Sequence, residues 1–353
     1  METQLTRYIG LDAHSESCTI AVLGQSGKRL RYERLQTSAE LLKSFIKEVP
    51  RPRHLCMEEG TLSEWLYEEL TPVVDKLVVV LPDRTPGNKS DLIDACKLAD
   101  DLRRDAIRRP VYKAPGCFRT LREAARTHYV LQRDKVRTKS RLNALCRGCG
   151  HPELGKSLYA SKTRTEALKQ LPEHLRPRAA LFGQQLDALL ECTSQAESWL
   201  REECSRVPIV KRLATAPGIG LVRAAYLVAV VMTPHRFRTA RQFWSYSGLA
   251  VVTRSSSDWV SDGSGKWRRS KTQQTRGLNH NRHPLLKNVF KGAALQITLM
   301  PEHPLGQAYQ RLLMTTKPNL ARLTIARRLA AAVLSMWKHG EDYDPSKHGE
   351  KTM

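Results

Sequence analysis

The sequence predicts an α/β domain at the N-terminal end of the chain, followed by an α-helical connector and a mainly α C-terminal domain. Between residues 7 and 107, short apolar runs rich in β-favouring residues alternate with turn residues and amphipathic stretches. After residue 116, apolar residues recur at helical spacing over longer stretches. A length of 353 residues leaves room for two or three domains, each with its own core.

The stretch from Arg7 to Leu23 predicts two strands, because two apolar runs flank a short polar turn. Gly24 to Gly27 is typical of a hairpin turn, which leads into a third strand from Lys28 to Leu35. Ser38 is expected to cap a helix with Leu41, Leu42, Phe45 and Ile46 on its buried face. The remaining elements are a strand at His54–Met57, a helix with Leu62, Trp65, Leu66 and Leu70 inward, a strand at Leu77–Leu81 and a helix at Asp91–Ile107.

The order of these elements predicts the topology of the sheet. Strands joined by tight turns form an antiparallel meander, and strands joined through helices pair in parallel by right-handed crossovers. This is the element order of the ribonuclease H-like fold. We expect this domain over residues 1–113, the connector over 114–206, the C-terminal domain over 207–340 and a tail over 341–353.

Acidic residues stand at the ends of these elements. Asp12 ends the first strand, Glu58 and Glu59 end the fourth, and Asp91 and Asp94 share the first turn of the last helix. In this topology they converge near one end of the sheet, where clustered carboxylates need a cation. Oxygen ligands select Mg²⁺ or Mn²⁺, and two such ions could act on a phosphodiester.

The same residues also have ordinary structural explanations. Asp12 could cap the turn to Ser15, and Asp91 and Asp94 could be helix-start charges that the helix dipole favours. Their joint occurrence in a strongly basic chain favours the metal site.

A formal net charge of +23 predicts an anionic partner, and nucleic acid is the leading candidate. The sequence has no apolar run long enough for a membrane span and no signal peptide, so we expect a cytoplasmic protein without a membrane partner. The eight scattered cysteines fit reduced thiols. Cys146 and Cys149, with His151 nearby, could bind zinc, but the adjacent glycines favour a tight turn between helices.

Two long helices are predicted for the connector. Gly116 to Leu145 is strongly basic, and a second helical stretch runs from Thr165 towards Cys204, interrupted near Pro172 and Pro177. An apolar stripe on the second stretch predicts a helical hairpin or the seam of a coiled-coil dimer. The basic residues form either a solvated face or a nucleic-acid surface.

The C-terminal part contains three candidate nucleic-acid elements. Gly218 and Gly220, in A-P-G-I-G, resemble the hairpin of helix-hairpin-helix modules, where glycine lets backbone N–H groups approach a phosphate. The serines at 255–257 form either a flexible loop or a loop that carries a nucleophile. Residues 263–300 hold eight Lys or Arg and no Asp or Glu. The expected phosphate contacts of this segment are Lys266, Arg268, Arg269, Lys271 and Arg276.

Four pieces of the sequence, in order, resemble the one-ten family of insertion-sequence transposases. They are I-G-L-D-A-H at 9–14, M-E-E-G-T at 57–61, K-S-D-L-I-D-A at 89–95, and a C-terminal set. That set runs from A-P-G-I-G through Y-S-G-L and S-S-S to Q-T-R-G-L-N at 274–279 and L-K-N-V-F-K-G-A-A at 286–294. The resemblance covers nearly the whole chain.

The resemblance implies a RuvC-like nuclease domain with a D-E-D-D metal site and a C-terminal transposase domain with a catalytic serine. Carried over to this sequence, the acids are Asp12, Glu58, Asp91 and Asp94, with Glu59 as a rival to Glu58. The serine falls on Ser256 or Ser255, and we favour Ser256, although Asp258-Trp259 follows the serines where the family has S-G. The resemblance also implies a structured guide RNA, encoded by the element, that pairs with target and donor DNA.

Together these observations predict a DNA recombinase that moves its own insertion sequence, with double-stranded DNA of the element ends and target as substrate. Strand exchange at two sites implies a homo-oligomer, either a dimer or a tetramer. Two alternatives stay open: a metal-dependent junction-type endonuclease that uses water, and a non-catalytic nucleic-acid-binding protein with the same fold. In each case the expected location is the bacterial cytoplasm, at the nucleoid.

Overall fold

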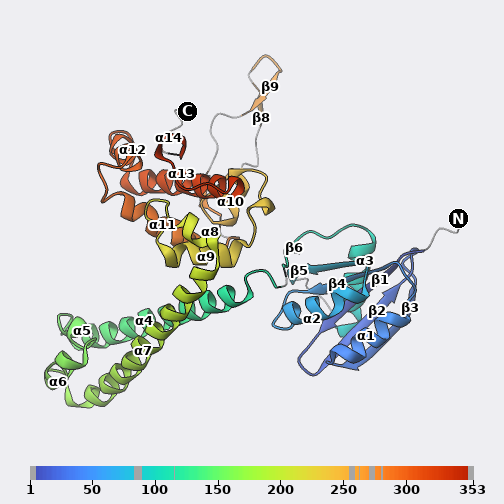
Figure 1. Cartoon of the computed structure of the whole chain (residues 1–353), viewed down its shortest axis with the longest axis horizontal. Coiled ribbons are helices and arrows are strands. Elements are labelled where there is room, and N and C mark those ends of the chain that lie inside the picture. Colours follow the sequence, from blue (N-terminus) through green and yellow to red (C-terminus); the bar gives the residue numbers. More distant parts are fainter. Residues whose placement is uncertain are drawn as a thin grey trace. The chain divides into compact units, whose positions relative to one another are not determined.

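A computed structural model describes residues 5–82, 90–114, 116–253, 259–261, 263–269, 275–279 and 281–348. The chain divides into two compact units, Met1–Cys117 and Phe118–Met353 (Figure 1).

The first unit is built on a six-stranded mixed sheet with the strand order β3-β2-β1-β4-β5-β6. The strands are β1 (Arg7–Ala13), β2 (Ser17–Leu23), β3 (Arg29–Gln36), β4 (Arg53–Glu58), β5 (Lys76–Val80) and β6 (Pro110–Val111). The first three strands form an antiparallel meander, and β1, β4 and β5 pair in parallel. The predicted ribonuclease H-like order of elements is therefore confirmed, and β6 is an additional edge strand that the sequence did not reveal.

Helices cover both faces of this sheet. α1 (Ala39–Glu48) and α2 (Ser63–Leu70), with the 3₁₀ turn η1 (Thr71–Val73), share one apolar core with Ile9 and Leu11 of β1. α3 (Asp91–Arg103) packs on the opposite face, where Leu98 and Leu102 meet Cys56 of β4. Alternate residues of each strand thus belong to different layers.

Two predicted core residues of the first unit are in fact exposed. Leu41 of α1 is 44% exposed and Trp65 of α2 is 38% exposed. The buried face of α1 begins one turn earlier, with Ala39, because the sheet contacts only a narrow stripe of the helix.

A helical hairpin begins the second unit. Its helices are α4 (Arg119–Gly148), α5 (Leu154–Ser157), α6 (Ser161–Lys169), the 3₁₀ turn η2 (Glu173–Leu175) and α7 (Arg176–Arg206). The long helices α4 and α7 pack against each other (Figure 1). Cys146 lies buried in the core near the turn of the hairpin. Pro177 occupies the first turn of α7, so it starts this helix, where the sequence predicted an interruption.

The rest of the second unit is mainly helical. It contains α8 (Pro208–Leu213), α9 (Leu221–Val231), η3 (Pro234–Arg236), α10 (Ala240–Tyr246), α11 (Pro284–Ile297), α12 (Pro304–Leu313), α13 (Pro318–His339) and α14 (Pro345–His348). Two small strand pairs join β7 (Val251–Thr253) to β10 (Thr275–Leu278) and β8 (Trp259–Ser261) to β9 (Trp267–Arg269). One large core unites α8, α9, α11 and α13 with the first turns of α4 and the end of α7.

Over the ranges that the structure covers, no helix is both long and apolar enough to cross a membrane.

Candidate metal centre and nucleic-acid surface

Asp12 lies at the end of β1 on the face of the sheet that α3 covers. Ile9 and Leu11 of the same strand are buried in the core on the other face, and side chains alternate along a strand. The Asp12 side chain is 16% exposed, so its carboxylate is largely shielded from water.

Gly10 lets α3 approach β1 closely. A Cβ at this position would lie 1.8 Å from the backbone oxygen of Ala95 in α3, which is an impossible contact. Glycine is therefore required here for packing rather than for its backbone angle. The consequence is that the start of α3 lies beside the end of β1.

The first turn of α3 carries Asp91 and Asp94. Ser90 caps the helix, because its hydroxyl accepts a hydrogen bond from the backbone N–H of Ile93 at 3.3 Å. Both aspartates lie on the helix stripe that continues into the buried residues Ala95 and Leu98. Asp91 and Asp94 therefore face the sheet side of the helix, in the direction of Asp12.

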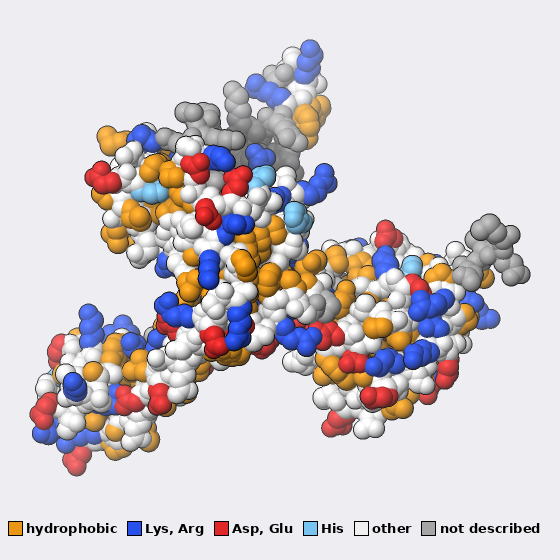
Figure 2. Space-filling view, in the orientation of Figure 1, with side chains coloured by type: hydrophobic (Ala, Val, Ile, Leu, Met, Phe, Trp, Pro, Cys, Tyr) orange, Lys and Arg blue, Asp and Glu red, His pale blue; other side chains and the backbone are white. Residues whose placement is uncertain are grey.

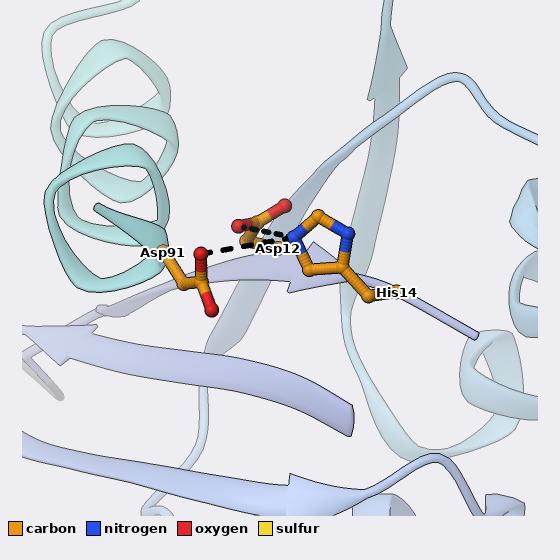
Figure 3. Close-up of side chains that lie close together, drawn as sticks. All are labelled: Asp12, His14 and Asp91. Carbon is orange, nitrogen blue, oxygen red and sulfur yellow. Dashed lines mark hydrogen bonds and ion pairs between the residues drawn. The ribbon is translucent and has the colours of Figure 1, made fainter. Parts of the chain in front are cut away.

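His14 completes a close cluster with Asp12 and Asp91 (Figure 3). Its Nε2 atom lies 3.2 Å from Oδ2 of Asp12 and 3.8 Å from Oδ1 of Asp91. His14 was not among the site residues predicted from the sequence, although it stands in the I-G-L-D-A-H motif. The available signal was its position two residues after Asp12, directly beyond the end of β1, since alternate residues of an extended chain share a face.

The charge environment of Asp12 is that of a crowded acidic site. Burial raises the pKa of the Asp12 carboxyl above its usual value, the His14 side chain opposes this rise, and the charges of Asp91 and Asp94 add to it. Arg34 offers only a distant countercharge, with Nη2 at 3.8 Å from Asp91 and a side chain that is 69% exposed.

Glu58 and Glu59 lie on opposite sides of the sheet layer. β4 pairs with β1 so that Met57 is level with Leu11, which brings Glu58 level with Asp12 one step further on. Glu58 shares its strand face with Cys56, which packs against α3. The Glu59 carboxylate instead accepts a hydrogen bond from Ser63 of α2 at 3.0 Å and pairs with Lys113 at 2.7 Å.

The donor set of this cluster fits a divalent cation. The ligand atoms of Asp12, His14 and Asp91 lie within 4.8 Å of one another, and in the described part of the chain this is the one such group of three or more. Opposite ligands of an octahedral Mg²⁺ or Mn²⁺ lie about 4.2 Å apart, so a small closure would suffice. The carboxylates suit either ion, and the imidazole favours Mn²⁺ over Mg²⁺.

The predicted serine nucleophiles cannot be placed in the same way. Ser255 and Ser256, which follow β7 in the sequence, lie outside the described residues. Lys271, which follows β9, also lies outside them.

Two of the predicted phosphate contacts are exposed at β9 and at the turn before it. Lys266 and Arg268 are solvent-exposed, and Trp267 between them is 68% exposed. The backbone of Arg269 belongs to β9 and that of Arg276 to β10. Lys and Arg side chains are also spread over the visible face of both units (Figure 2).

Gly218 and Gly220 differ in whether the fold has room for a side chain in their place. Gly218 has φ +72°, and a Cβ there would lie 2.6 Å from the backbone oxygen of Ala293 in α11, so the fold itself demands glycine. A Cβ at Gly220 would meet nothing within 4 Å. Gly220 forms the N-cap of α9 without a side chain, so the backbone there is open to a ligand.

Comparison with known proteins finds that two separate parts of the chain are similar to transposases. A family model of DEDD transposases of the IS110 type, described as "Transposase", matches residues 9–150, and a model described as "Transposase IS116/IS110/IS902 family" matches residues 210–290. A transposase for insertion sequence element IS1533 from Leptospira borgpetersenii is 28% identical over 139 residues, or 37% of this chain. The match spans 39% of the length of that relative.

Proposed function

Because the chain belongs to the IS110 family of insertion-sequence transposases, we propose that it cuts and rejoins double-stranded DNA at its element ends and at a target. The observation that carries this proposal is the convergence of Asp12, at the end of the central strand β1, with Asp91 and Asp94, at the start of α3, in a ribonuclease H-like domain. Such a cluster is costly to a fold unless it holds a cation.

In this proposal Asp12, Glu58, Asp91 and Asp94 hold Mg²⁺ or Mn²⁺. The bound ion would polarise the scissile phosphate and stabilise charge on the attacking and leaving oxygens. The chain's own contribution is to fix the ligands. Gly10 brings α3 against β1, Ser90 sets the start of α3, and the His14 imidazole lies beside two of the carboxylates as a further ligand. The alternation of strand faces supports Glu58 over Glu59 as the fourth acid.

The nucleophile in our proposal is the hydroxyl of Ser256, with Ser255 as the alternative. Its oxygen forms a bond to phosphorus, the bond from phosphorus to one strand oxygen breaks, and the hydroxyl proton passes to the released strand. The resulting phosphoserine ester keeps the bond energy, so a hydroxyl of the new partner strand can displace the serine without a nucleotide cofactor. The match of the second family model to residues 210–290 supports a role for this loop.

Nucleic acid is the proposed partner of the C-terminal unit. The net charge of +23 and the exposed Lys266 and Arg268 support contacts to DNA backbone and to a guide RNA encoded by the element. The further contacts that we propose are Gly218, Gly220, Arg269, Lys271 and Arg276. A protein with these partners would act at the bacterial nucleoid.

We also propose that the connector, residues 114–206 between domains at 1–113 and 207–340, forms a coiled-coil contact in a dimer or tetramer. The α4–α7 hairpin exposes Val136 at 60% and Leu181 at 65%, which supports a further apolar contact there. Light scattering of the full chain with and without DNA would measure the assembly.

The test of the proposal is a cleavage and trapping assay on suicide DNA that carries an element end. Wild-type protein with Mg²⁺ or Mn²⁺ is expected to leave protein covalently attached to a strand end, and peptide mapping should locate the link at Ser256. Ser256→Ala should abolish the adduct and Ser255→Ala should retain it. Asp12→Asn and Asp94→Asn should abolish cleavage while the protein stays folded.

The outcomes separate the three candidate functions. Cleavage without an adduct, unaffected by replacing all three serines, would identify a nuclease that uses water. Binding that is indifferent to Asp12→Asn, with no cleavage under any condition, would identify a binding protein. Recovery of an RNA from the flanking noncoding stretch with the purified protein would support the guide.

A further inference from the structure

A cavity of about 450 Å³ lies between α4, α9 and α11, within the second unit. Apolar side chains such as Leu221, Leu285 and Val289 line it, together with the polar side chains of Gln132, Arg223 and Asn288. The aromatic ring of Tyr129 also lines it. Its volume and its mix of apolar surface with a few polar groups are those of small-molecule sites.

Arg223 brings a positive charge to this cavity without a carboxylate to neutralise it. Nη1 donates a hydrogen bond to the backbone oxygen of Gly218 at 2.7 Å, and among the described residues no acidic partner accompanies it. Burial lowers the pKa of its guanidinium, so the protein environment disfavours this charge. An anionic group in the cavity would relieve that cost.

The start of α9 faces the same cavity with bare backbone. Gly220 lines the cavity, offers no capping side chain, and has open space where a Cβ would stand. The first N–H groups of a helix lack acceptors within the helix and favour an anion. Arg223 and the N-terminal N–H groups of α9 therefore both line the cavity, and both favour binding of a phosphate there.

The amide nitrogen of Gln132 already has a hydrogen-bond partner, the side chain of His128. The hydroxyl of Tyr226 lies 2.7 Å from Nδ1 of the buried His128, and Nε2 of His128 lies 3.2 Å from the Gln132 amide nitrogen. Within the described part of the chain the amide oxygen of Gln132 has no hydrogen-bond partner, so it can contact a ligand. An amide fixed in this way, beside an aromatic ring, suits the hydrogen-bonding edge of a nucleobase.

We propose that this cavity accepts a single unpaired nucleotide of a bound DNA or RNA strand. The phosphate contacts Arg223 and the start of α9, and the base lies against Tyr129 with its edge on Gln132 and Asn288. A paired base is excluded because the cavity has room for one nucleotide and not for a duplex. The site rests on the proposed nucleic-acid function and adds to it a preference for distorted or unpaired strands.

The experiment uses the full chain and two matched duplexes, one continuous and one with a single bulged 2-aminopurine, in DNA and in RNA. We expect the bulged duplex to bind about tenfold tighter, since contact of a base with an aromatic side chain is worth that order of affinity. The 2-aminopurine emission should change on binding. Preference in the DNA pair alone assigns the strand to DNA, and preference in the RNA pair alone assigns it to RNA.

The variants separate the cavity from general backbone binding. Tyr129→Leu and Asn288→Ala should each reduce the preference for the bulge by severalfold and leave affinity for the continuous duplex unchanged. Gly220→Asp should also remove it, although Asp is a good N-cap and should not lower the melting temperature. Asn319→Ala, an exposed asparagine on α13, is the matched control and should keep the preference.

Equal binding of both duplexes, or a preference that survives Tyr129→Leu and Asn288→Ala together, would overturn the proposal while leaving the nucleic-acid function intact. A different outcome would refute the nucleic-acid function and the cavity proposal with it: neither duplex binds, or binding does not weaken as the salt concentration rises.

Discussion

Replacing Asp12 by Asn should stabilise the metal-free protein and destabilise the metal-bound one. Asp12 is a largely buried carboxylate beside Asp91 and Asp94. Burial raises its pKa, His14 opposes this rise, and the two neighbouring carboxylates add to it. A group with a raised folded-state pKa contributes stability below its ordinary value of 3.8 and loses it as the pH rises through the raised value. Ionisation of Asp12 therefore destabilises the metal-free fold.

The size of the effect follows from the geometry of the cluster. Carboxylate oxygens of Asp12 and Asp91 lie within 4.8 Å, where two charges repel by about 1 kcal/mol in water and about 3.5 kcal/mol at an effective dielectric constant of 20. Asp91 is 41% exposed, so water screens it and the lower figure applies. A gain of ~1 kcal/mol corresponds to a rise in melting temperature of roughly 4 °C for a unit of this size.

With a divalent cation bound, the wild-type protein should be more stable than Asp12→Asn, the reverse of the order without metal. At one hundred times its dissociation constant, a ligand that binds only the folded state stabilises it by about 2.7 kcal/mol. Wild-type protein should gain this increment with Mn²⁺, and Asp12→Asn should gain far less because a ligand is lost. Calorimetry of the full chain, with chelator and with Mn²⁺, would record the transition of the N-terminal unit in each state.

The matched control is Asp105→Asn, the same chemical change in an exposed residue of the same unit. Asp105 has φ 53°, a conformation that Asn also tolerates, so no shift is expected with or without metal. The reasoning is refuted if Asp12→Asn lowers the melting temperature in chelator, or if it keeps the full stabilisation by Mn²⁺. A gain that persists unchanged below pH 4 would also contradict it.

Three further predictions concern the same site. Gly10→Ala should cost about 1–3 kcal/mol of unfolding free energy in urea titrations and should weaken Mn²⁺ binding, since a Cβ there would separate α3 from β1; unchanged stability would contradict this packing role. Glu58→Gln should abolish DNA cleavage at unchanged stability. Glu59→Gln should keep cleavage but lower the unfolding free energy by about 1 kcal/mol, because Glu59 pairs with the largely buried Lys113. The reverse pattern would exchange the two roles. His14→Ala should reduce the affinity for Mn²⁺, measured by titration calorimetry, more than that for Mg²⁺; equal losses would show that the imidazole is not a ligand.

The topology of the first unit was predictable because local signals agree there. Tight turns such as Gly24–Gly27 mark the meander, and amphipathic helices between the later strands imply crossovers. The two-residue strand β6 was not predictable, since a proline and a valine carry no periodicity. Leu41 and Trp65 were misassigned because a helical stripe can be displaced by one position without changing the composition of the helix.

The site was predictable only in part. The ends of β1 and α3 converge by topology, so Asp12, Asp91 and Asp94 could be grouped from the sequence. His14 was missed because a polar residue after a strand usually belongs to a turn. Which of Glu58 and Glu59 faces α3 depends on the exact end of β4, and a shift by one residue exchanges the two faces.

The most direct test of the metal centre is an anomalous diffraction map from crystals of the full chain grown with Mn²⁺. The account predicts a peak between β1 and the start of α3, at about 2.1–2.2 Å from carboxylate oxygens of Asp12 and Asp91, with Glu58 and Asp94 within reach of the same ion or of a second one. The peak should be absent in Asp12→Asn crystals. Its absence from the wild-type cluster, or its appearance at acids elsewhere, would contradict the assignment of this site.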